Sequence, residues 1–487
     1  MAKFNGTNTM KTTNKSGHVA YDMKDKEKLV TQVLTTFFNE DKYYGDNSKE
    51  IVNLATKIAN NEPKFISSLA MYARKVYHLR SISHVLTCIV AHEEKTKQYI
   101  GRTVNSVVER ADDLTEILAC YMSMYGKPIP NGLKKALAKK MNEFDEYSFA
   151  KYNRDSATIK FRDILRLVHV KPKNKAQSEL FKKVLDDTLA TPITWETELS
   201  AKGNNKETWE GLIDSNKVGY MAMLRNLRNI LNAQPENLSK VLEKLGNEKE
   251  VVRSKQLPFR FYNAYREIVN NSNASSKVLD TLEDAMEYSV CNMPLLSGST
   301  AIFIDSSGSM SSRISSKSTT DCYEIAKLLG VLASRICDDS MTFTFSSGGW
   351  SSSGRNSTKK VNISSRDGIL SQVNGKFTSC GGGTSMEDPF KYVINNKMLF
   401  DRIIVLSDNE VNGYGSTTIQ SYADEYRRKF NKNLWVHAID LQGYGTQQFM
   451  GSKTNIIAGW SEKVLEFIDI VEKGMDGQVK AIENYEG

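Results

Sequence analysis

The sequence predicts a mainly α-helical region followed by an α/β domain. Apolar residues recur at helical spacing from about residue 25 to residue 295, and strand-like alternation is scarce there. Beyond residue 296, short apolar runs alternate with helical patterns, which is typical of a mostly parallel, doubly wound sheet. A chain of 487 residues is long enough for two such domains, each with its own core.

The first 17 residues are polar and rich in Asn, Thr and Lys. They show no periodic apolar pattern, so we expect residues 1–17 to be a disordered tail. The helical region then extends over residues 18–295, and the α/β domain over residues 296–487.

The helical region predicts stacked helix pairs. Ile51, Leu54, Ala55 and Ile58 repeat at helical spacing, and Pro63 stands where a first-turn proline would start the next helix. Further helical runs include 114–125, 161–170, 218–231 and 275–290. Because no strict sequence period is present, we interpret the region as a degenerate helical repeat of the HEAT kind.

The α/β domain is predicted from five apolar runs with helical patterns between them. The predicted strands are Ala301–Ile304, Met341–Phe345, Arg402–Leu406, Leu434–Ile439 and Asn455–Ala458. The predicted helices cover about 320–336, 386–396, 417–430 and 461–473. Doubly wound sheets hold ligands at the carboxyl ends of their strands, so functional residues are expected there.

Charge is distributed unevenly along the chain. The formal net charge is +8, and residues 1–295 carry 45 Lys and Arg against 36 Asp and Glu. Such an excess in one domain indicates a polyanion partner, since phosphate contacts require Lys and Arg. A basic surface that is merely solvated would show the same excess.

Composition also limits the compartment and the cofactor class. No run of about 20 apolar residues is present, and the first residues lack the apolar middle of a signal peptide, so we expect a cytoplasmic protein. The cysteines are widely spaced and form no CxxC pair, which argues against a disulfide framework and a zinc site. We expect reduced thiols, mostly buried, at Cys88, Cys120, Cys291, Cys322, Cys337 and Cys380.

A candidate metal site follows the first predicted strand. Asp305, Ser307 and Ser309 form a DxSxS motif, Thr384 lies in the CGGGTS loop, and Asp408 ends the strand RIIVLSD. Short hydroxyl and carboxylate side chains on neighbouring strand-end loops provide the oxygen ligands that a hard cation such as Mg²⁺ requires. Three consecutive glycines, 381–383, would let the middle loop approach closely.

The same residues have other interpretations. Asp305 could cap a turn, and Ser307 and Ser309 could be ordinary turn residues. Ser309 is a weak candidate nucleophile, because it is not in a GxSxG elbow and His437 lies within a strand-like run. The sequence contains no GxxxxGKS loop to support nucleotide hydrolysis.

Several segments together resemble the Ro autoantigen and its bacterial orthologues, in which a TROVE module precedes a von Willebrand A domain. The resemblance covers nearly the whole chain. It rests on the metal motif with its SDNE continuation and on four other segments: Tyr43-Tyr44, AKYNRDSATIKFRDILRLVHVKPKN (150–174), MLRNLRNI (223–230) and LPFRFYNAY (257–265). The string DILRLVHVKP is the most specific of these.

The resemblance implies a ring of helical repeats closed by a metal-binding von Willebrand A-like domain, and a non-enzymatic, monomeric RNA-binding protein. It implies a basic hole that admits single-stranded ends of structured or misfolded RNA, and an outer basic surface that binds a small non-coding Y-type RNA. It further implies an adaptor role toward a 3′ exonuclease of the polynucleotide phosphorylase type.

Carried over by position, the family's RNA-contacting lysine corresponds to Lys151 and its RNA-contacting histidine to His169. The stretch between them is one residue longer here than in the vertebrate pattern. The residues themselves form the densest basic stretch of the chain, which comprises Lys151, Arg154, Lys160, Arg162, Arg166, His169, Lys171 and Lys173. Of these we predict RNA contacts for Lys151, Arg154, Arg166, His169 and Lys171. The alternative is that Arg166 and His169 are an ordinary surface pair on one helix.

Other interpretations stay open at this point. A second basic run, Lys134-Lys135 with Lys139-Lys140, is either a solvated helix face or an RNA contact. The chain could also be a partner-recruiting scaffold, in which the metal site binds a carboxylate of another protein without RNA. An enzyme is disfavoured, because Asp305 and Asp408 are accompanied by hydroxyls and not by the extra acids that two-metal catalysis uses.

Overall fold

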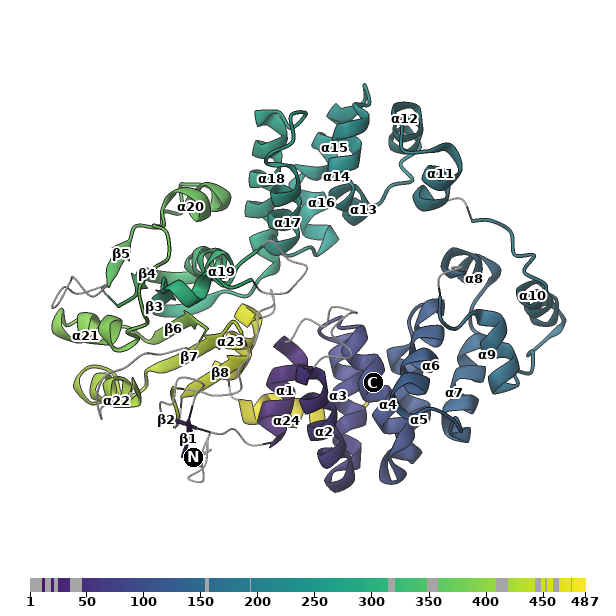
Figure 1. The fold of residues 1–487 in the computed structure, drawn as a ribbon, viewed down its shortest axis with the longest axis horizontal. Coiled ribbons are helices and arrows are strands. Elements are labelled where there is room, and N and C mark those ends of the chain that lie inside the picture. The colour runs from purple at the N-terminus through teal and green to yellow at the C-terminus, as the bar shows by residue number, and fades with distance from the viewer. Residues whose placement is uncertain are drawn as a thin grey trace. The chain divides into compact units, whose positions relative to one another are not determined.

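The structure is a computed structural model, shown in Figure 1. It describes residues 11–13, 19–21, 25–35, 46–153, 157–192, 194–313, 320–347, 358–408, 419–442, 448–451, 453–458, 464–473 and 475–487. The chain divides into two compact units: residues 25–201 with 477–487, and residues 1–24 with 202–476. Each unit is described by itself.

The unit of residues 25–201 with 477–487 is built from helices. They are α1 (Asp25–Thr35), α2 (Asp46–Asn61), α3 (Pro63–Lys75), α4 (Ser81–His92), α5 (Ile100–Val107), α6 (Ala111–Tyr125), α7 (Asn131–Met141), α8 (Glu146–Tyr152), α9 (Phe161–Val168), α10 (Lys175–Leu185) and α11 (Trp195–Lys202). A 3₁₀ segment, η2 (Glu94–Tyr99), precedes α5. Pro63 starts α3, as predicted.

Helices α4 and α6 run in the same direction. Three contacts between them join residues 29 positions apart: His84 with Asp113, Cys88 with Ile117, and His92 with Tyr121. A constant offset between contacting residues requires parallel helices, and parallel alternate helices are what stacked helix pairs produce. The predicted helical repeat is therefore confirmed.

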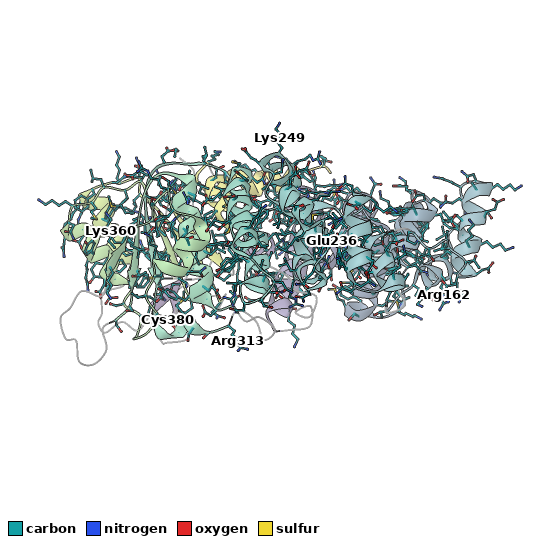
Figure 2. All side chains as sticks on the ribbon, turned by 90° about the horizontal axis from the view of Figure 1, so that it is seen from above. Arg162, Glu236, Lys249, Arg313, Lys360 and Cys380 are labelled. Carbon is teal, nitrogen blue, oxygen red and sulfur yellow. The ribbon has the colours of Figure 1, made fainter. Side chains whose placement is uncertain are left out.

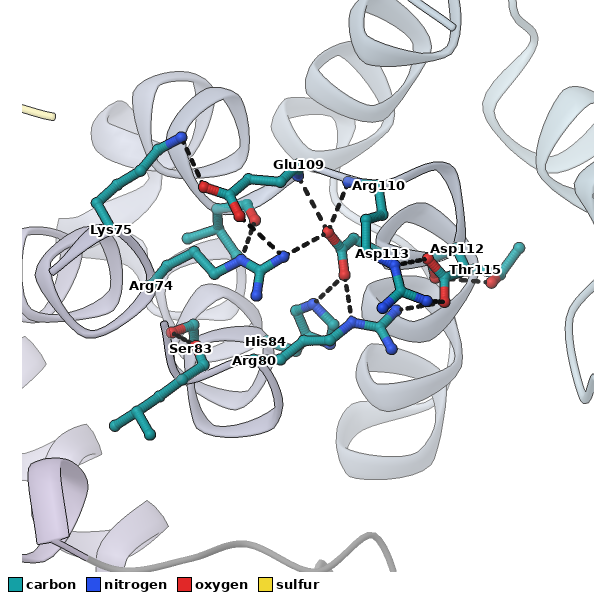
Figure 3. A network of polar contacts seen from close by, with 12 residues as sticks. Arg74, Lys75, Arg80, Ser83, His84, Glu109, Arg110, Asp112, Asp113 and Thr115 are labelled. Carbon is teal, nitrogen blue, oxygen red and sulfur yellow. Dashed lines mark hydrogen bonds and ion pairs between the residues drawn. The ribbon is translucent and has the colours of Figure 1, made fainter. Parts of the chain in front are cut away.

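A buried charge network ties the start of α6 to α3 and α4 (Figure 3). The carboxylate of Asp113 pairs with Arg74 at 3.1 Å and with Arg80 at 2.5 Å, and lies 3.1 Å from the His84 ring nitrogen. Its Oδ2 also accepts hydrogen bonds from the backbone N–H groups of Glu109 and Arg110. Every buried charge in the network has a partner, which a buried ionic group requires.

The last residues of the chain belong to this helical unit. Helix α24 (Met475–Glu483) ends in it, and Ile482 is fully buried. The Tyr485 carbonyl accepts a hydrogen bond from Ser68 at 3.0 Å, and Glu486 pairs with Lys64 and Arg102. The last residues of the sequence thus pack into the core that the helices from α1 onward form.

The second unit contains the remaining helices and the sheet. Its helices before the sheet are α12 (Lys206–Asp214), α13 (Tyr220–Arg225), α14 (Leu227–Ala233), α15 (Leu238–Leu245), α16 (Glu248–Ser254), α17 (Pro258–Ile268) and α18 (Ser276–Ser289), followed by the 3₁₀ segment η3 (Val290–Asn292). The run 218–231, predicted as one helix, is two helices that meet at Asn226. The Asn226 side chain bonds the Ala222 carbonyl, a contact that competes with helical continuation.

The sheet has six strands in the order β5-β4-β3-β6-β7-β8. They are β3 (Leu296–Asp305), β4 (Cys337–Phe345), β5 (Lys359–Val361), β6 (Arg402–Ser407), β7 (Trp435–Asp440) and β8 (Thr454–Ala458), and all neighbours are parallel except β4 and β5. The connecting elements are η4 (Gly308–Ser311), α19 (Cys322–Ile336), α20 (Ile369–Gly375), α21 (Glu387–Asn395), α22 (Ile419–Lys429) and α23 (Val464–Glu472).

Helices cover both faces of this sheet. On one face Phe303 and Phe343 pack against Phe390 of α21 and Tyr426 of α22. On the other, α19 lies against the strands so closely that a Cβ at Gly330 would stand 2.5 Å from the Ile304 side chain. The predicted doubly wound domain is confirmed, including its five predicted strands.

The helices before the sheet are joined to the α/β domain. Glu283 of α18 accepts hydrogen bonds from the backbone N–H groups of Leu370 and Ser371, which start α20. Glu324 of α19 pairs with Arg266 of α17. The predicted boundary at 295/296 marks the change from helices to strands, whereas the compact units divide elsewhere because these contacts hold α17 and α18 against the sheet domain.

The predicted disordered tail requires one correction. Residues Lys11–Thr13 form strand β1, which pairs antiparallel with β2 (Val19–Tyr21). The β-branched residues of both segments favour extended backbone. The remainder of residues 1–17 lies outside the described residues.

Candidate metal site and nucleic-acid interface

The predicted metal ligands lie at the carboxyl edge of the sheet. Asp305 is the last residue of the central strand β3, and Asp408 directly follows the neighbouring strand β6. The chain moves outward from β3 in both directions, to β4 on one side and to β6 on the other. This reversal of strand order creates the crevice in which doubly wound sheets bind ligands.

Hydrogen bonds hold the DxSxS turn in place. Asp305 Oδ1 accepts from the backbone N–H of Ser307 at 2.8 Å, and the Ser307 and Ser309 hydroxyl oxygens lie 3.1 Å apart. The turn interpretation of Asp305 therefore holds, and it is compatible with a ligand role because a carboxylate oxygen has a second lone pair.

The loop that carries Thr384 is fastened to this turn. Gly308 N–H donates to the Gly382 carbonyl at 2.9 Å, and Gly381 N–H donates to the Ser306 carbonyl at 2.8 Å. Gly382 has a positive φ of 78°, and a Cβ there would stand 2.3 Å from the Ser347 carbonyl oxygen. The close approach predicted for the glycine loop is thus required at Gly382, whereas a Cβ at Gly381 meets nothing within 4 Å.

The electrostatics of the site favour a bound cation. Asp305, Thr384 and Asp408 are at most 2% exposed. Burial raises the pKa of Asp305 to about 7, the hydrogen bonds from Ser407 and Ser307 oppose this rise, and the charge of Asp408 adds to it. Two buried carboxylates at one strand edge are costly without a proton or a cation. The donor set of two carboxylates and three hydroxyls fits a hard divalent ion.

Two further features of the site bear on the sequence predictions. Ser407 donates a 2.7 Å hydrogen bond to Asp305 Oδ2, a contact that the sequence predictions missed although Ser407 immediately precedes Asp408. His437, considered as a partner for Ser309, is buried on β7 and bonds Glu472 and Asn455 instead. Among the described residues, no group of three or more His, Cys, Asp or Glu side chains is placed to hold a metal ion.

The predicted RNA-contacting residues fall into two clusters of the helical unit. The first contains Arg166, His169 and Lys171, all exposed, at the end of α9 and just after it. His169 ends α9 in the left-handed conformation, with φ 53°. His169 thus caps the helix that carries Arg166, and the alternative that the two are an ordinary surface pair stays open.

Asn142, at the end of α7, holds this first cluster. Its side chain donates to the Lys171 carbonyl at 3.0 Å and accepts from the Lys173 backbone N–H at 2.9 Å. Figure 1 shows α7 and α9 side by side. The basic run at the end of α7 thus adjoins the basic segment after α9, and in that run Lys140 pairs with Glu143.

Lys151 lies in the second cluster, in the last turn of α8. Its ammonium nitrogen is 5.8 Å from the Tyr147 ring centre and 5.5 Å from that of Tyr152. Phe149, on the opposite side of α8, packs against Phe161 at the start of α9. Helix α9 has eight residues and is about 12 Å long, so Lys151 lies near one end of it and His169 at the other. Arg154 lies outside the described residues.

Side chains are drawn over both units in Figure 2, with Arg162 of α9 labelled in the helical unit and Cys380, beside the glycine loop, in the other. The six cysteines are all unpaired, as predicted. Cys88 and Cys322 are buried, Cys291 is exposed, and the other three are half-buried, so the expectation that most are buried holds only in part.

None of the described helices has the length and apolar character that crossing a bilayer requires.

Family models match nearly the whole chain. The TROVE domain model matches residues 23–190 and 187–293, and the Ro60 vWA domain model matches residues 300–469. The chain belongs to the Ro family of TROVE-domain proteins. The resemblance noted from the sequence is therefore confirmed, and TROVE and Ro proteins are RNA-binding proteins.

Curated relatives share part of this Ro-family chain. It is 27% identical over 303 residues to telomerase protein component 1 of Mus musculus and 26% identical over 300 residues to that of Rattus norvegicus. The matches cover 45% and 44% of this chain but only 12% and 11% of those relatives.

A solved structure shares the fold. The crystal structure of the Deinococcus radiodurans Ro protein superposes with a TM-score of 0.69 at 14% sequence identity, covering 91% of this chain and 100% of that one. This likeness, together with the two family models, confirms the predicted combination of helical repeats with a von Willebrand A domain.

Proposed function

We propose that this Ro-family protein is a non-enzymatic RNA-binding scaffold. It binds small non-coding Y-type RNA and the single-stranded ends of structured or misfolded RNA, and it serves RNA quality control, as an adaptor that brings RNA to a 3′ exonuclease. The observation that carries the proposal is the set of exposed basic side chains within a TROVE domain, namely those of Lys151, Arg166, Lys171 and Lys173. Exposed lysine and arginine side chains supply phosphate contacts, and single-stranded RNA leaves its bases free for further contacts.

The two basic clusters suit this function in different ways. The segment with His169 and Lys171 has its backbone fixed by Asn142, so its side chains project from a defined loop. Lys151 forms no ion pair with a described residue, and its charge is available to a phosphate. The chain is proposed to act as a cytoplasmic monomer.

We propose further that Asp305, Ser307, Ser309, Thr384 and Asp408 hold a divalent cation, with Mg²⁺ favoured. The burial and mutual repulsion of Asp305 and Asp408 support this proposal. When bound, the ion would balance the two carboxylates and offer open coordination positions to a ligand oxygen.

Copurification tests the RNA proposal. Protein purified at low salt should carry nucleic acid, seen as a raised ratio of absorbance at 260 nm to that at 280 nm, and high salt should remove it because phosphate contacts are screened. Ribonuclease, but not deoxyribonuclease, should digest the released material. A protein that carries no nucleic acid and binds none when RNA is added would favour the alternative of a metal-dependent protein-recruiting scaffold.

A further inference from the structure

One surface of the helical unit combines exposed aromatic rings with cations. Tyr147 and Lys151 are four residues apart on α8 and therefore lie on one face of the helix. Tyr147 is 51% exposed, so a face of its ring is open to a partner. Neither Tyr147 nor its neighbour Tyr152 was singled out from the sequence, although the spacing in EYSFAKY signals the shared face.

The opposite face of α8 fixes the helix in place. Phe149 is fully buried and contacts Phe144, Phe161 and Phe181, with ring centres 5.0 to 6.5 Å apart. Glu146 also pairs with Lys183 of α10 at 2.7 Å. Tyr147 and Lys151 are therefore presented on a helix that is anchored on its other side.

A second cation extends the surface to the start of α6. The Arg110 guanidinium lies over the Tyr152 ring, 4.5 Å from its centre, and Lys151 lies 5.5 Å from the same ring. Asp112 holds Arg110 through two hydrogen bonds of 2.9 and 2.8 Å, and Asp112 also pairs with Arg80. The order along the surface is thus Arg110, Tyr152, Lys151 and Tyr147, and its Arg110 end is fastened to the Asp113 network of Figure 3.

We infer that Tyr147 is a stacking platform for a base of single-stranded RNA, with Lys151 contacting the adjacent phosphate and Arg110, beyond Tyr152, contacting a phosphate further along the strand. This inference rests on the proposed function and assigns a role to an aromatic side chain. An exposed tyrosine ring accepts any base on its face, and cations that lie next to it along the surface neutralise phosphates of the same strand. The surrounding charge favours a polyanion over a basic peptide, since residues 151–175 contain eight Lys and Arg against two Asp.

Stacking makes a prediction that phosphate contacts do not. Stacking requires the base, whereas an ionic contact requires only the phosphate. The probe is therefore a structured RNA hairpin with a single-stranded 3′ tail, made in two forms: one with bases throughout the tail, and one with abasic residues in it. Both forms carry the same charge.

The test compares binding of the full-length parent and three variants by fluorescence anisotropy. Tyr147→Ala should weaken binding of the tail with bases about tenfold or more, leave binding of the abasic tail unchanged, and preserve the salt dependence. Tyr147→Phe should bind like the parent, because the ring remains. Tyr422→Ala is the matched control, since Lys391 lies over the Tyr422 ring in the other unit and this variant should bind like the parent.

Each other outcome overturns the inference. Equal losses for both tails would show that Tyr147→Ala disturbs the fold or the phosphate contacts, and an unchanged affinity for the tail with bases would show that no base stacks there. In either case the parent would still bind RNA and the proposed function would stand. If the parent bound neither tail, the proposed function itself would fail along with the inference.

Discussion

At the residue scale, the positions of the candidate metal ligands at the strand ends could be predicted from the sequence, whereas their supporting contacts could not. Asp305, Thr384 and Asp408 are recognisable because they follow strands or a glycine loop in the order that the fold requires. Ser407 was missed because its role depends on β6 lying beside β3, which the residue pattern alone does not establish. His169 was placed on a helix because its left-handed backbone leaves no mark in the apolar pattern.

Replacing Asp305 with Ala should separate the two proposed functions. The substitution removes the anionic ligand of the first loop, so the variant should no longer be stabilised against heat by millimolar Mg²⁺ or Mn²⁺. RNA binding should change little, because the basic clusters lie in the helical unit. Isothermal titration with metal and anisotropy with RNA measure the two properties. Equal loss of both by a folded variant would show that the functions are wrongly divided.

Replacing Lys151 and replacing His169 should change the salt dependence of RNA binding differently. Lys151→Ala should weaken binding of many RNAs and reduce the log–log salt slope by about 0.7, because one phosphate contact disappears. His169→Ala should cost about 1–3 kcal/mol of binding free energy with little change in slope, because a stacking or hydrogen-bonding group displaces few counterions. Anisotropy titrations at several salt concentrations measure both quantities.

General destabilisation would weaken binding in both variants without this contrast. If both variants bind as tightly as the parent, while combined substitution of Lys134, Lys135, Lys139 and Lys140 abolishes binding, the RNA surface lies on α7. The predicted contacts at Lys151 and His169 would then be wrong. The comparison is between adjoining surfaces, because Asn142 places the end of α7 directly beside the segment after α9.

At the scale of elements, the sequence predicts whether a helix or a strand forms wherever the apolar pattern is long. The five predicted strands match β3, β4, β6, β7 and β8 closely. Strand β5 and helix α20 were missed because β5 has three residues, two of them lysine, and α20 starts where carboxylates of α18 accept its first N–H groups. Such caps come from residues more than eighty positions away and leave no local signal.

The Asp113 network should control how α3, α4 and α6 hold together. Burial alone would raise the pKa of Asp113, but the hydrogen bond from His84 and the charges of Arg80 and Arg74 outweigh it and hold that pKa well below its ordinary range. Burial lowers the pKa of His84, and the hydrogen bond to Asp113 opposes this fall. The stabilisation is therefore present above the unfolded pKa of about 4 and is lost as pH falls below it.

Asp113→Ala should lower the free energy of unfolding of the helical unit by about 3–5 kcal/mol at pH 7, because it removes the fully buried carboxylate that pairs with both Arg74 and Arg80. The difference between parent and variant should shrink as pH falls from 5 toward 3. Urea denaturation at several pH values, followed by circular dichroism, measures it. Lys140→Ala serves as a control, because its pair with Glu143 is at the surface and contributes at most about 1 kcal/mol. A constant difference across this pH range would contradict the assignment.

At the scale of the whole molecule, the order of domains was predictable and the compact units were not. The change from helical to strand patterns near residue 296 is visible in the sequence. Residues 477–487 pack against the first helices through contacts such as the hydrogen bond from Ser68 to the Tyr485 carbonyl. This contact joins residues 417 positions apart. No periodic pattern encodes such a partner.

Removal of residues 477–487 should loosen the helical unit selectively. The truncation removes the fully buried side chain of Ile482 from the core of the helical unit. It also removes Glu486, which pairs with Lys64 and Arg102. Hydrogen exchange, read by mass spectrometry, should therefore quicken in α2, α3 and α5 while the strands β3 and β6 stay protected. Uniform protection of the helices in the truncated protein would show that the C-terminal segment contributes nothing to their stability.

The central claim is that the basic helical unit binds RNA through phosphate contacts, and salt dependence measures this most directly. The probe is a hairpin RNA with a single-stranded 3′ tail, and the dissociation constant is measured from 50 to 300 mM salt. Since each phosphate contact on a single strand contributes a slope of about −0.7, the four cationic side chains predicted to contact RNA, Lys151, Arg154, Arg166 and Lys171, predict a slope of about −2.8. A flat response over this range, or no binding at 50 mM salt, would contradict the account.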